Sequence, residues 1–89
     1  MSILYSLNNL PQGSIAYIEK IVANPIFGDQ DQVVSRRLAD LGFSPYIPIK
    51  IIAKGWLGRG PYVVQLNHHT QFSLRRAEAE KIVCTLHHT

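Results

Sequence analysis

Residues 29–52 read DQDQVVSRRLADLGFSPYIPIKII, and this stretch joins a helical pattern to a strand pattern. In its first half, Val34, Leu38 and Leu41 fall on one stripe at helical spacing, and the charged residues lie off it. In its second half, isoleucines alternate with other residues, which is the period of a strand. The sequence therefore predicts a helix over residues 29–41, followed by a strand over residues 47–52.

The ends of this helix carry their own signals. Asp29 is expected to cap the first turn, with Gln32 three residues later as in a capping box. Gly42 is placed to take the left-handed conformation just past the last turn, and Phe43 would then fold back onto the apolar stripe. Pro45 prevents the helix from continuing. We expect a helix that ends at a glycine cap.

Four further segments on either side of this stretch have the short apolar alternation of strands. They are residues 14–22, 62–66, 71–74 and 82–86, so that with residues 47–52 the sequence predicts five strands. Residues 1–13 are expected to be a lead-in without a strand, and residues 75–81 a helical turn. Because Pro48 lacks an amide hydrogen, its amide side is expected to face a sheet edge or a bulge.

The faces of the first predicted strand follow from its alternation. Ile15, Tyr17 and Ile21 are expected to share one face, with Lys20 on the other. Ile18 shares the Lys20 face, so both faces are expected to be partly covered. Five short strands with one main helix predict a mainly β fold, a small and partly open barrel, since closure removes exposed strand edges.

Length and composition limit what such a chain can do. The 89 residues are expected to form a single domain, 1–89, with 46% hydrophobic and 17% charged residues, which is a globular composition. A chain of this length buries a small core. The sequence therefore excludes large multidomain enzymes and motor proteins, and it argues against a deep active site with many residues.

The net charge argues against a nucleic-acid-binding protein, and the cysteine content favours a reducing compartment. The formal charge of +3 is well short of the clustered basic residues of a dedicated nucleic-acid binder. One cysteine excludes an internal disulfide. The first charged residue is Glu19, so a basic signal-peptide region is missing, and the uncharged stretch before it is too polar to span a membrane. We expect a soluble, cytoplasmic protein.

Five motifs, in order and spacing, resemble the ferrous iron transport protein A (FeoA) family. They are Leu7-Asn8-Asn9-Leu10-Pro11-Gln12-Gly13, the run Arg36-Arg37-Leu38-Ala39-Asp40-Leu41-Gly42-Phe43-Ser44-Pro45, a Leu57-Gly58 loop ending at Pro61, Phe72-Ser73-Leu74-Arg75, and Ala79-Glu80-Lys81-Ile82. The resemblance extends from Leu7 to about Leu86. It implies an SH3-like barrel, a cytosolic location and a role in assisting FeoB, a GTPase-linked ferrous iron permease of the membrane. A related barrel also occurs as the C-terminal domain of iron-dependent repressors.

The glycine-rich loop of residues 54–61 is one candidate partner contact. It holds Trp56 and Leu57 between glycines, with Lys54 and Arg59 beside them, and it lacks the Lys-Ser/Thr of a phosphate-binding loop. Large apolar side chains at a loop tip either fold over the core or contact a partner. Both alternatives remain open from the sequence. The loop also departs from the family pattern, because Trp56 stands where a proline is usual.

Two basic pairs form a second candidate contact. Arg36-Arg37 and Arg75-Arg76 are either solvated faces with nearby carboxylates, or contacts to an acidic protein surface or to the anionic inner leaflet. The predicted partner contacts are Arg36 and Arg37 of the first pair together with Lys54, Trp56, Leu57 and Arg59.

The histidines are not expected to bind a metal ion, and the cysteine is not expected to be reactive. His68-His69 and His87-His88 are adjacent pairs, and neighbours on an extended chain point to opposite sides, so a converging ligand set is not expected. Cys84 shares phase with Ile82 and Leu86 and is expected to be a buried, inert thiol. We predict neither a metal site nor a cofactor nor a catalytic residue.

These observations favour a non-enzymatic accessory protein that docks on FeoB from the cytoplasm and is recruited to the membrane through it. The alternative is a detached barrel of the repressor type or a small basic nucleic-acid binder, which lacks a helix-turn-helix signal here. Self-association is left open by the sequence. No nucleic-acid partner is expected.

Overall fold

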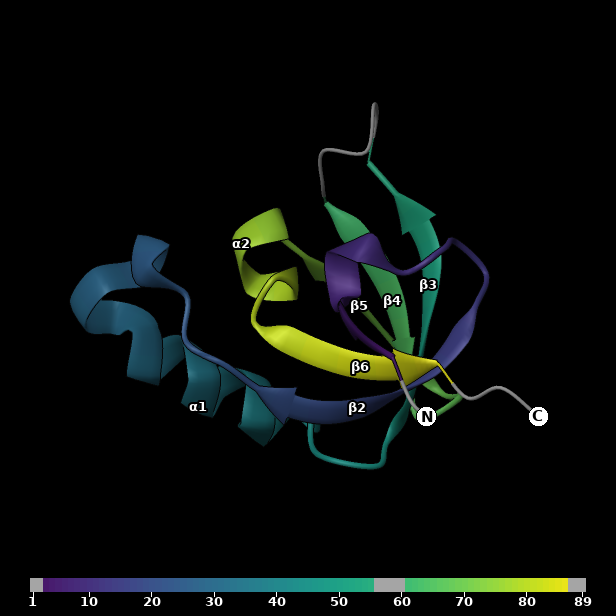
Figure 1. Ribbon diagram of the computed structural model, residues 1–89, viewed down its shortest axis with the longest axis horizontal. Coiled ribbons are helices and arrows are strands. Elements are labelled where there is room, and N and C mark those ends of the chain that lie inside the picture. Colours follow the sequence, from purple (N-terminus) through teal and green to yellow (C-terminus); the bar gives the residue numbers. More distant parts are fainter. Residues whose placement is uncertain (1–2, 56–60, 87–89) are drawn as a thin grey trace.

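The computed structural model describes residues 3–55 and 61–86, and its strands form one antiparallel sheet in the order β1-β6-β2-β3-β4-β5. The strands are β1 (Leu4–Ser6), β2 (Ile15–Ile21), β3 (Pro48–Lys54), β4 (Tyr62–Leu66), β5 (Thr70–Leu74) and β6 (Ile82–Leu86). The helical segments are the 3-10 turns η1 (Leu7–Asn9) and η2 (Pro25–Gln30) and the α-helices α1 (Asp31–Leu41) and α2 (Arg76–Ala79). In Figure 1, β2 and β6 cross in front of β3, β4 and β5, and α1 lies to one side. The predicted fold class, a mainly β and partly open barrel with one main helix, is confirmed.

The described part of the chain contains one strand more than the sequence predicts. Residues Leu4–Ser6 form β1, which pairs with β6, so the prediction of a strandless lead-in over residues 1–13 is wrong. Three residues are too few to show an alternating pattern, and this strand is defined by its pairing partner. Strands β4 and β6 have the predicted bounds.

The predicted faces of β2 hold as far as Ile18, where Ile15 and Tyr17 share one face, and the grouping of Ile21 with them is wrong. Ala16 and Ile18 are fully buried, whereas Ile15 and Tyr17 are 50% and 40% exposed. The register with β6 shifts by one residue after Ile18, and this bulge returns Ile21 to the core side. An extra residue in a strand changes which face the later side chains take. A strict alternation therefore places Ile21, which follows the bulge, on the wrong face of this strand.

The prediction that Pro48 faces a sheet edge or a bulge is also wrong. Pro48 is the first residue of β3, which lies between β2 and β4 within the sheet, and the bulge of β3 comes later, between Ile51 and Ala53. The first position of a strand tolerates a missing amide hydrogen. The carbonyl of Pro48 accepts a hydrogen bond of 2.8 Å from the amide of Asn67.

The core lies between the curled sheet and the helical segments. Its buried apolar side chains are Leu7, Leu10, Ala16, Ile18, Val34, Leu38, Phe43, Ile49, Ile51, Tyr62, Val64, Leu66, Leu74, Ala79, Ile82 and Cys84. From α1, Val34 and Leu38 enter this core, while Leu41 in the last turn is 43% exposed. The apolar stripe of the helix is therefore buried over its first two turns only.

The helix α1 ends at Gly42, whose φ of 111° is left-handed. The Gly42 amide donates to the carbonyl of Ala39 at 3.0 Å, and the Phe43 amide donates to that of Leu38 at 3.1 Å. These two bonds are those of a Schellman motif. Phe43 is fully buried, and its ring lies 5.4 Å from that of Phe72 on β5. The Phe43–Phe72 contact thereby packs the end of the helix against β5, the edge strand of the sheet.

The helix begins two residues later than predicted. Residues 25–30 form η2, α1 starts at Asp31, and the residue before it, Gln30, makes no side-chain cap bond. The predicted capping box of Asp29 and Gln32 is therefore wrong. Asn24 caps η2 instead, because its Oδ1 accepts a hydrogen bond from the amide of Ile26.

Candidate functional site

A polar clasp of Asn24, Asp31 and Lys81 holds η2 and α1 against α2. The Asn24 amide donates to Asp31 Oδ1 at 2.8 Å, which links the two ends of η2. The Asn24 side-chain amide donates to the carbonyl of Ala77 in α2 at 3.0 Å. One asparagine thus bonds the segment before α1 to its own helix and to a helix distant in sequence.

Lys81 is the third member of the clasp, and its side chain is completely buried. Its Nζ donates to Asp31 Oδ1 and, at 3.4 Å, to the Asp31 carbonyl, and it lies 5.6 Å from the centre of the Phe27 ring. A buried ammonium group is tolerated only with such partners. The hydrogen bond from Lys81 lowers the pKa of Asp31, and the bond from the Asn24 amide adds to this effect.

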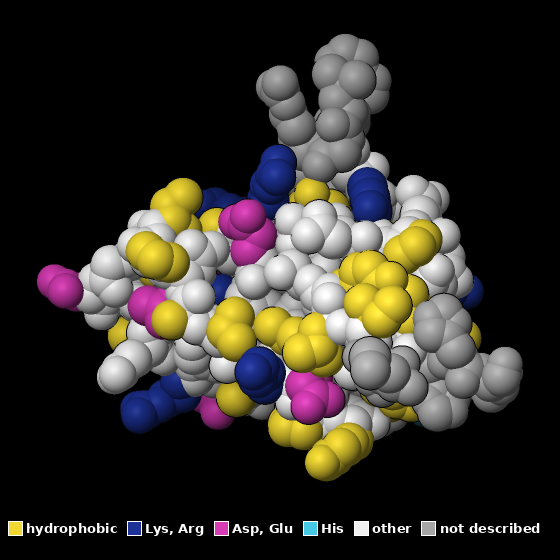
Figure 2. Space-filling view, viewed as in Figure 1, with side chains coloured by type: hydrophobic (Ala, Val, Ile, Leu, Met, Phe, Trp, Pro, Cys, Tyr) yellow, Lys and Arg dark blue, Asp and Glu magenta, His cyan; other side chains and the backbone are white. Residues whose placement is uncertain are grey.

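A groove lies beside the clasp, between the η2–α1 side and α2. We call it the α1–α2 groove, and it has a volume of about 430 Å³. Its apolar lining residues are Ile26, Phe27, Val34 and Ala77, and its charged lining residues, which we call its rim, are Arg37, Arg75 and Glu78. In Figure 2, hydrophobic side chains lie next to basic and acidic ones at the upper left, over the area where η2 and α2 face each other in Figure 1.

The charges on the rim are unequal. Glu78 Oε1 accepts a hydrogen bond of 2.9 Å from the Arg75 amide, so this carboxylate is engaged at the start of α2. Within residues 3–55 and 61–86, neither the Arg37 nor the Arg75 guanidinium has an ion-pair partner. The neighbouring Arg76 does have one, since it lies 3.9 Å from Glu80. The groove therefore presents two cations that are unpaired within the described part of the chain, next to apolar side chains.

The structure places the predicted contact residues in separate regions. Lys54 ends β3, and its Nζ donates to the Asn8 carbonyl at 3.4 Å. Arg36 and Arg37 are both exposed on α1, and Arg37 lines the groove. Trp56, Leu57 and Arg59 lie outside the described residues, so the predicted contact loop is not described.

The most exposed aromatic side chain of the described residues is Tyr46, in the turn between α1 and β3. Tyr46 is 84% exposed and has a left-handed φ of 71°, a conformation that bulky residues rarely take. The Ile47 amide donates to the Ser44 carbonyl at 3.3 Å across this turn. Pro45 and Tyr46 thus occupy the two central positions, and the second is one that usually carries glycine.

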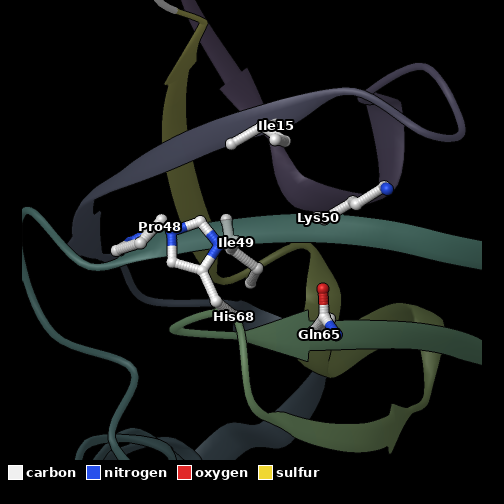
Figure 3. Close-up of a pocket in the computed structure, with 6 residues that line it drawn as sticks. All are labelled: Ile15, Pro48, Ile49, Lys50, Gln65 and His68. Atoms are coloured by element: carbon white, nitrogen blue, oxygen red, sulfur yellow. The ribbon is translucent and has the colours of Figure 1, made fainter.

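His68 lines a second, smaller pocket on the outer face of the sheet. Its volume is about 160 Å³, and its other lining residues are Ile15, Pro48, Ile49, Lys50 and Gln65. Figure 3 shows the His68 ring beside Ile49, with Lys50 pointing away from it. Among residues 3–55 and 61–86, no three His, Cys, Asp or Glu side chains are close enough to hold a metal ion.

Cys84 is fully buried in β6, as its phase in the sequence predicts. Burial raises the pKa of the Cys84 thiol from 9.0 to about 12. Because the thiolate is the reactive form, this cysteine has no nucleophile to offer near neutral pH.

Sequence reasoning missed the residues that build the groove. Asn24 appears in the sequence only as part of a loop break, and Lys81 as one member of a predicted helical turn. Lysine is rarely fully buried, so nothing in the pattern identifies Lys81 as an interior residue. Arg75 is noted only as part of a basic pair, because its closeness to Arg37 arises from the fold.

Comparisons with known proteins agree on one family. The profile of the FeoA domain matches residues 5–86. FeoA of Stenotrophomonas maltophilia, a prokaryotic SH3-domain protein solved with zinc, is 32% identical with a TM-score of 0.73, over 94% of this chain and 88% of that one. FeoA of Chlorobium tepidum is 30% identical with a TM-score of 0.73, over 92% and 70% of the two chains.

A more distant protein shares the fold alone. IdeR of T. acidophilum is 20% identical with a TM-score of 0.70, and the match covers 94% of this chain and 34% of that one. No curated protein sequence matches this chain. In the described part of the chain, neither helix has the length and apolar character needed to cross a bilayer.

Proposed function

Since this chain belongs to the FeoA family, which is associated with ferrous iron transport, we propose that it is an accessory protein of ferrous iron uptake that acts by direct contact with the FeoB permease. The family match over residues 5–86 is the observation that carries the proposal. The α1–α2 groove supports it, because it offers an exposed basic and apolar surface of the kind that binds proteins.

The proposed action is binding and not chemistry. The buried Cys84 thiol has a pKa of about 12, and the rim of the groove carries two arginines and an engaged glutamate, which are groups suited to recognition. An accessory protein changes a transporter only if its affinities for the transporter's states differ. We therefore propose that the chain binds one conformational or nucleotide state of FeoB more tightly than the others.

The place of action follows from the partner. A protein that contacts the GTPase side of the permease would work in the cytoplasm and would reach the inner face of the membrane through that contact. The loop of Trp56, Leu57 and Arg59 and the residues Lys54 and Arg36 remain proposed further contacts from the sequence.

Ferrous iron uptake in cells tests the role. In a strain that lacks its own FeoA, expression of this chain is expected to restore uptake of radioactive ferrous iron under anaerobic conditions. In a strain that lacks FeoB as well, the same expression is expected to have no effect. Restored uptake without FeoB would contradict the proposal, as would unchanged uptake in a strain where FeoB is present and this chain is folded.

A further inference from the structure

The α1–α2 groove includes apolar side chains that are exposed on the surface of the described chain. Ile26 in η2 is 74% exposed, next to a half-buried Phe27. The volume of about 430 Å³ lies within the range of pockets that bind ligands. Exposed apolar surface with a polar rim is typical of sites that bind partners.

The rim selects the charge of whatever fills the groove. The Arg37 and Arg75 guanidinium groups are unpaired within the described residues, and the only acidic lining residue, Glu78, already accepts a hydrogen bond from the Arg75 amide. A bound carboxylate would complete the charge balance, and Arg geometry suits carboxylates through two parallel hydrogen bonds. The groove is complementary to an acidic ligand.

The polar clasp holds both walls before any partner arrives. Asn24 bonds α2 through the Ala77 carbonyl, and Lys81 bonds Asp31 beneath the Phe27 ring. A site that is already ordered loses less conformational freedom on binding. The clasp therefore makes the groove a preformed site.

We infer that the α1–α2 groove binds an acidic amphipathic segment of a protein, with its apolar side chains on Ile26 and Phe27 and its carboxylates on Arg37 and Arg75. That this protein is FeoB rests on the function proposed above. An anionic membrane fits less well, since surfaces that recognise lipids carry clusters of four to eight basic residues and the groove is concave with two arginines.

A peptide titration tests the surface without the transporter. The probe is a synthetic amphipathic helical peptide with leucines on one face and glutamates on the other, and the control peptide has lysine at every glutamate. In NMR spectra of the isotope-labelled chain, the acidic peptide is expected to shift the amides around Ile26, Phe27, Arg37 and Arg75. Equal binding of the lysine peptide, or shifts centred on the His68 pocket, would overturn the inference.

Charge reversal at the rim gives the matched comparison. Arg37→Glu combined with Arg75→Glu is expected to weaken binding of the acidic peptide at least about tenfold, and Ile26→Ser to weaken it independently of salt. The control is Lys50→Glu, a charge reversal in the other pocket. An equal loss with Lys50→Glu would show general electrostatic attraction and overturn the inference. Melting temperatures verify that each variant is folded.

Two further arms separate this inference from the proposed function. If the cytosolic domain of FeoB binds the chain and its rim variants equally well, the function stands and the groove inference fails. If the acidic peptide binds the groove while the FeoB domain does not bind the chain, the groove inference stands and the function fails. Binding to phosphatidylserine vesicles without binding to the acidic peptide would place a membrane in the groove and overturn the inference.

Discussion

At the residue scale, Gly42 shows how a single backbone conformation limits substitution. With its φ of 111°, any side chain is strained, and an added Cβ would lie 3.2 Å from Leu66 Cδ2. Gly42→Ala is therefore expected to lower the free energy of unfolding by about 1 kcal/mol. Urea unfolding of the two proteins measures this. An unchanged midpoint would mean that the helix ends in another way in solution.

Cys84 makes stability depend on pH in the alkaline range. Its pKa is about 12 in the folded protein against 9.0 for an exposed thiol, so the folded state keeps a proton that the unfolded state loses. The free energy of unfolding is therefore expected to fall as pH rises above about 9, by up to about 1.4 kcal/mol per pH unit. Below that pH the thiol is protonated in both states and contributes no slope.

Other groups titrate in the same range, so the Cys84→Ala variant is the control for this prediction. It is expected to show a smaller loss of stability between pH 9 and pH 11 than the parent chain, whatever its stability at pH 7. Urea unfolding at several pH values compares the two slopes. Parallel slopes would contradict a buried, protonated thiol.

Single residues were predictable from the sequence where the pattern is local. The burial of Cys84 follows from its phase in a five-residue strand, and the position of Gly42 follows from the end of an apolar stripe. The burial of Lys81 could not be predicted, because it depends on Asp31, which the fold brings near from a distant part of the sequence. Tyr46 was missed for another reason, since its left-handed turn conformation runs against its residue type.

At the element scale, the start of α1 depends on the clasp more than on a local cap. Asp31→Asn would leave the buried Lys81 ammonium without its carboxylate, and burying an unpaired charge is costly. Lys81→Met would leave Asp31, which is partly exposed and keeps its bond from the Asn24 amide. The melting temperature is therefore expected to fall further for Asp31→Asn than for Lys81→Met.

The pH dependence of this pair has the opposite direction to that of Cys84. The pKa of Asp31 is lowered in the folded protein, so its stabilising effect is present above the ordinary value of 3.8 and is lost as pH falls through the folded value. The parent chain should lose more stability on acidification than Asp31→Asn does. For the two melting temperatures, a larger fall for Lys81→Met than for Asp31→Asn would contradict the role given to the Asp31–Lys81 pair.

Elements were predictable where alternation or helical spacing runs for several residues. β4 and β6 meet this condition, and so do the middle and the end of α1. β1 is too short for such a pattern, and the bulge in β2 breaks it. The first turn of the helix was misplaced because its capping residue, Asn24, belongs to the preceding 3-10 turn.

At the scale of the whole molecule, the fold creates a surface that the sequence contains only in pieces. Arg37 lies on α1 and Arg75 lies just ahead of α2, and the apolar side chains of the groove come from η2, α1 and α2. The family, and with it the SH3-like fold, could be identified from motifs spread along the chain. The groove could not be predicted, because the closeness of its walls depends on hydrogen bonds between residues far apart in sequence.

The most direct test of the account is a calorimetric titration of this chain with the purified cytosolic domain of FeoB, in its GDP-bound and GTP-analogue-bound forms. The account predicts saturable binding with different affinities for the two forms, weakened by the paired Arg37→Glu and Arg75→Glu changes and retained by Lys50→Glu. An absence of binding to both nucleotide forms, with the chain shown to be folded, would contradict the account.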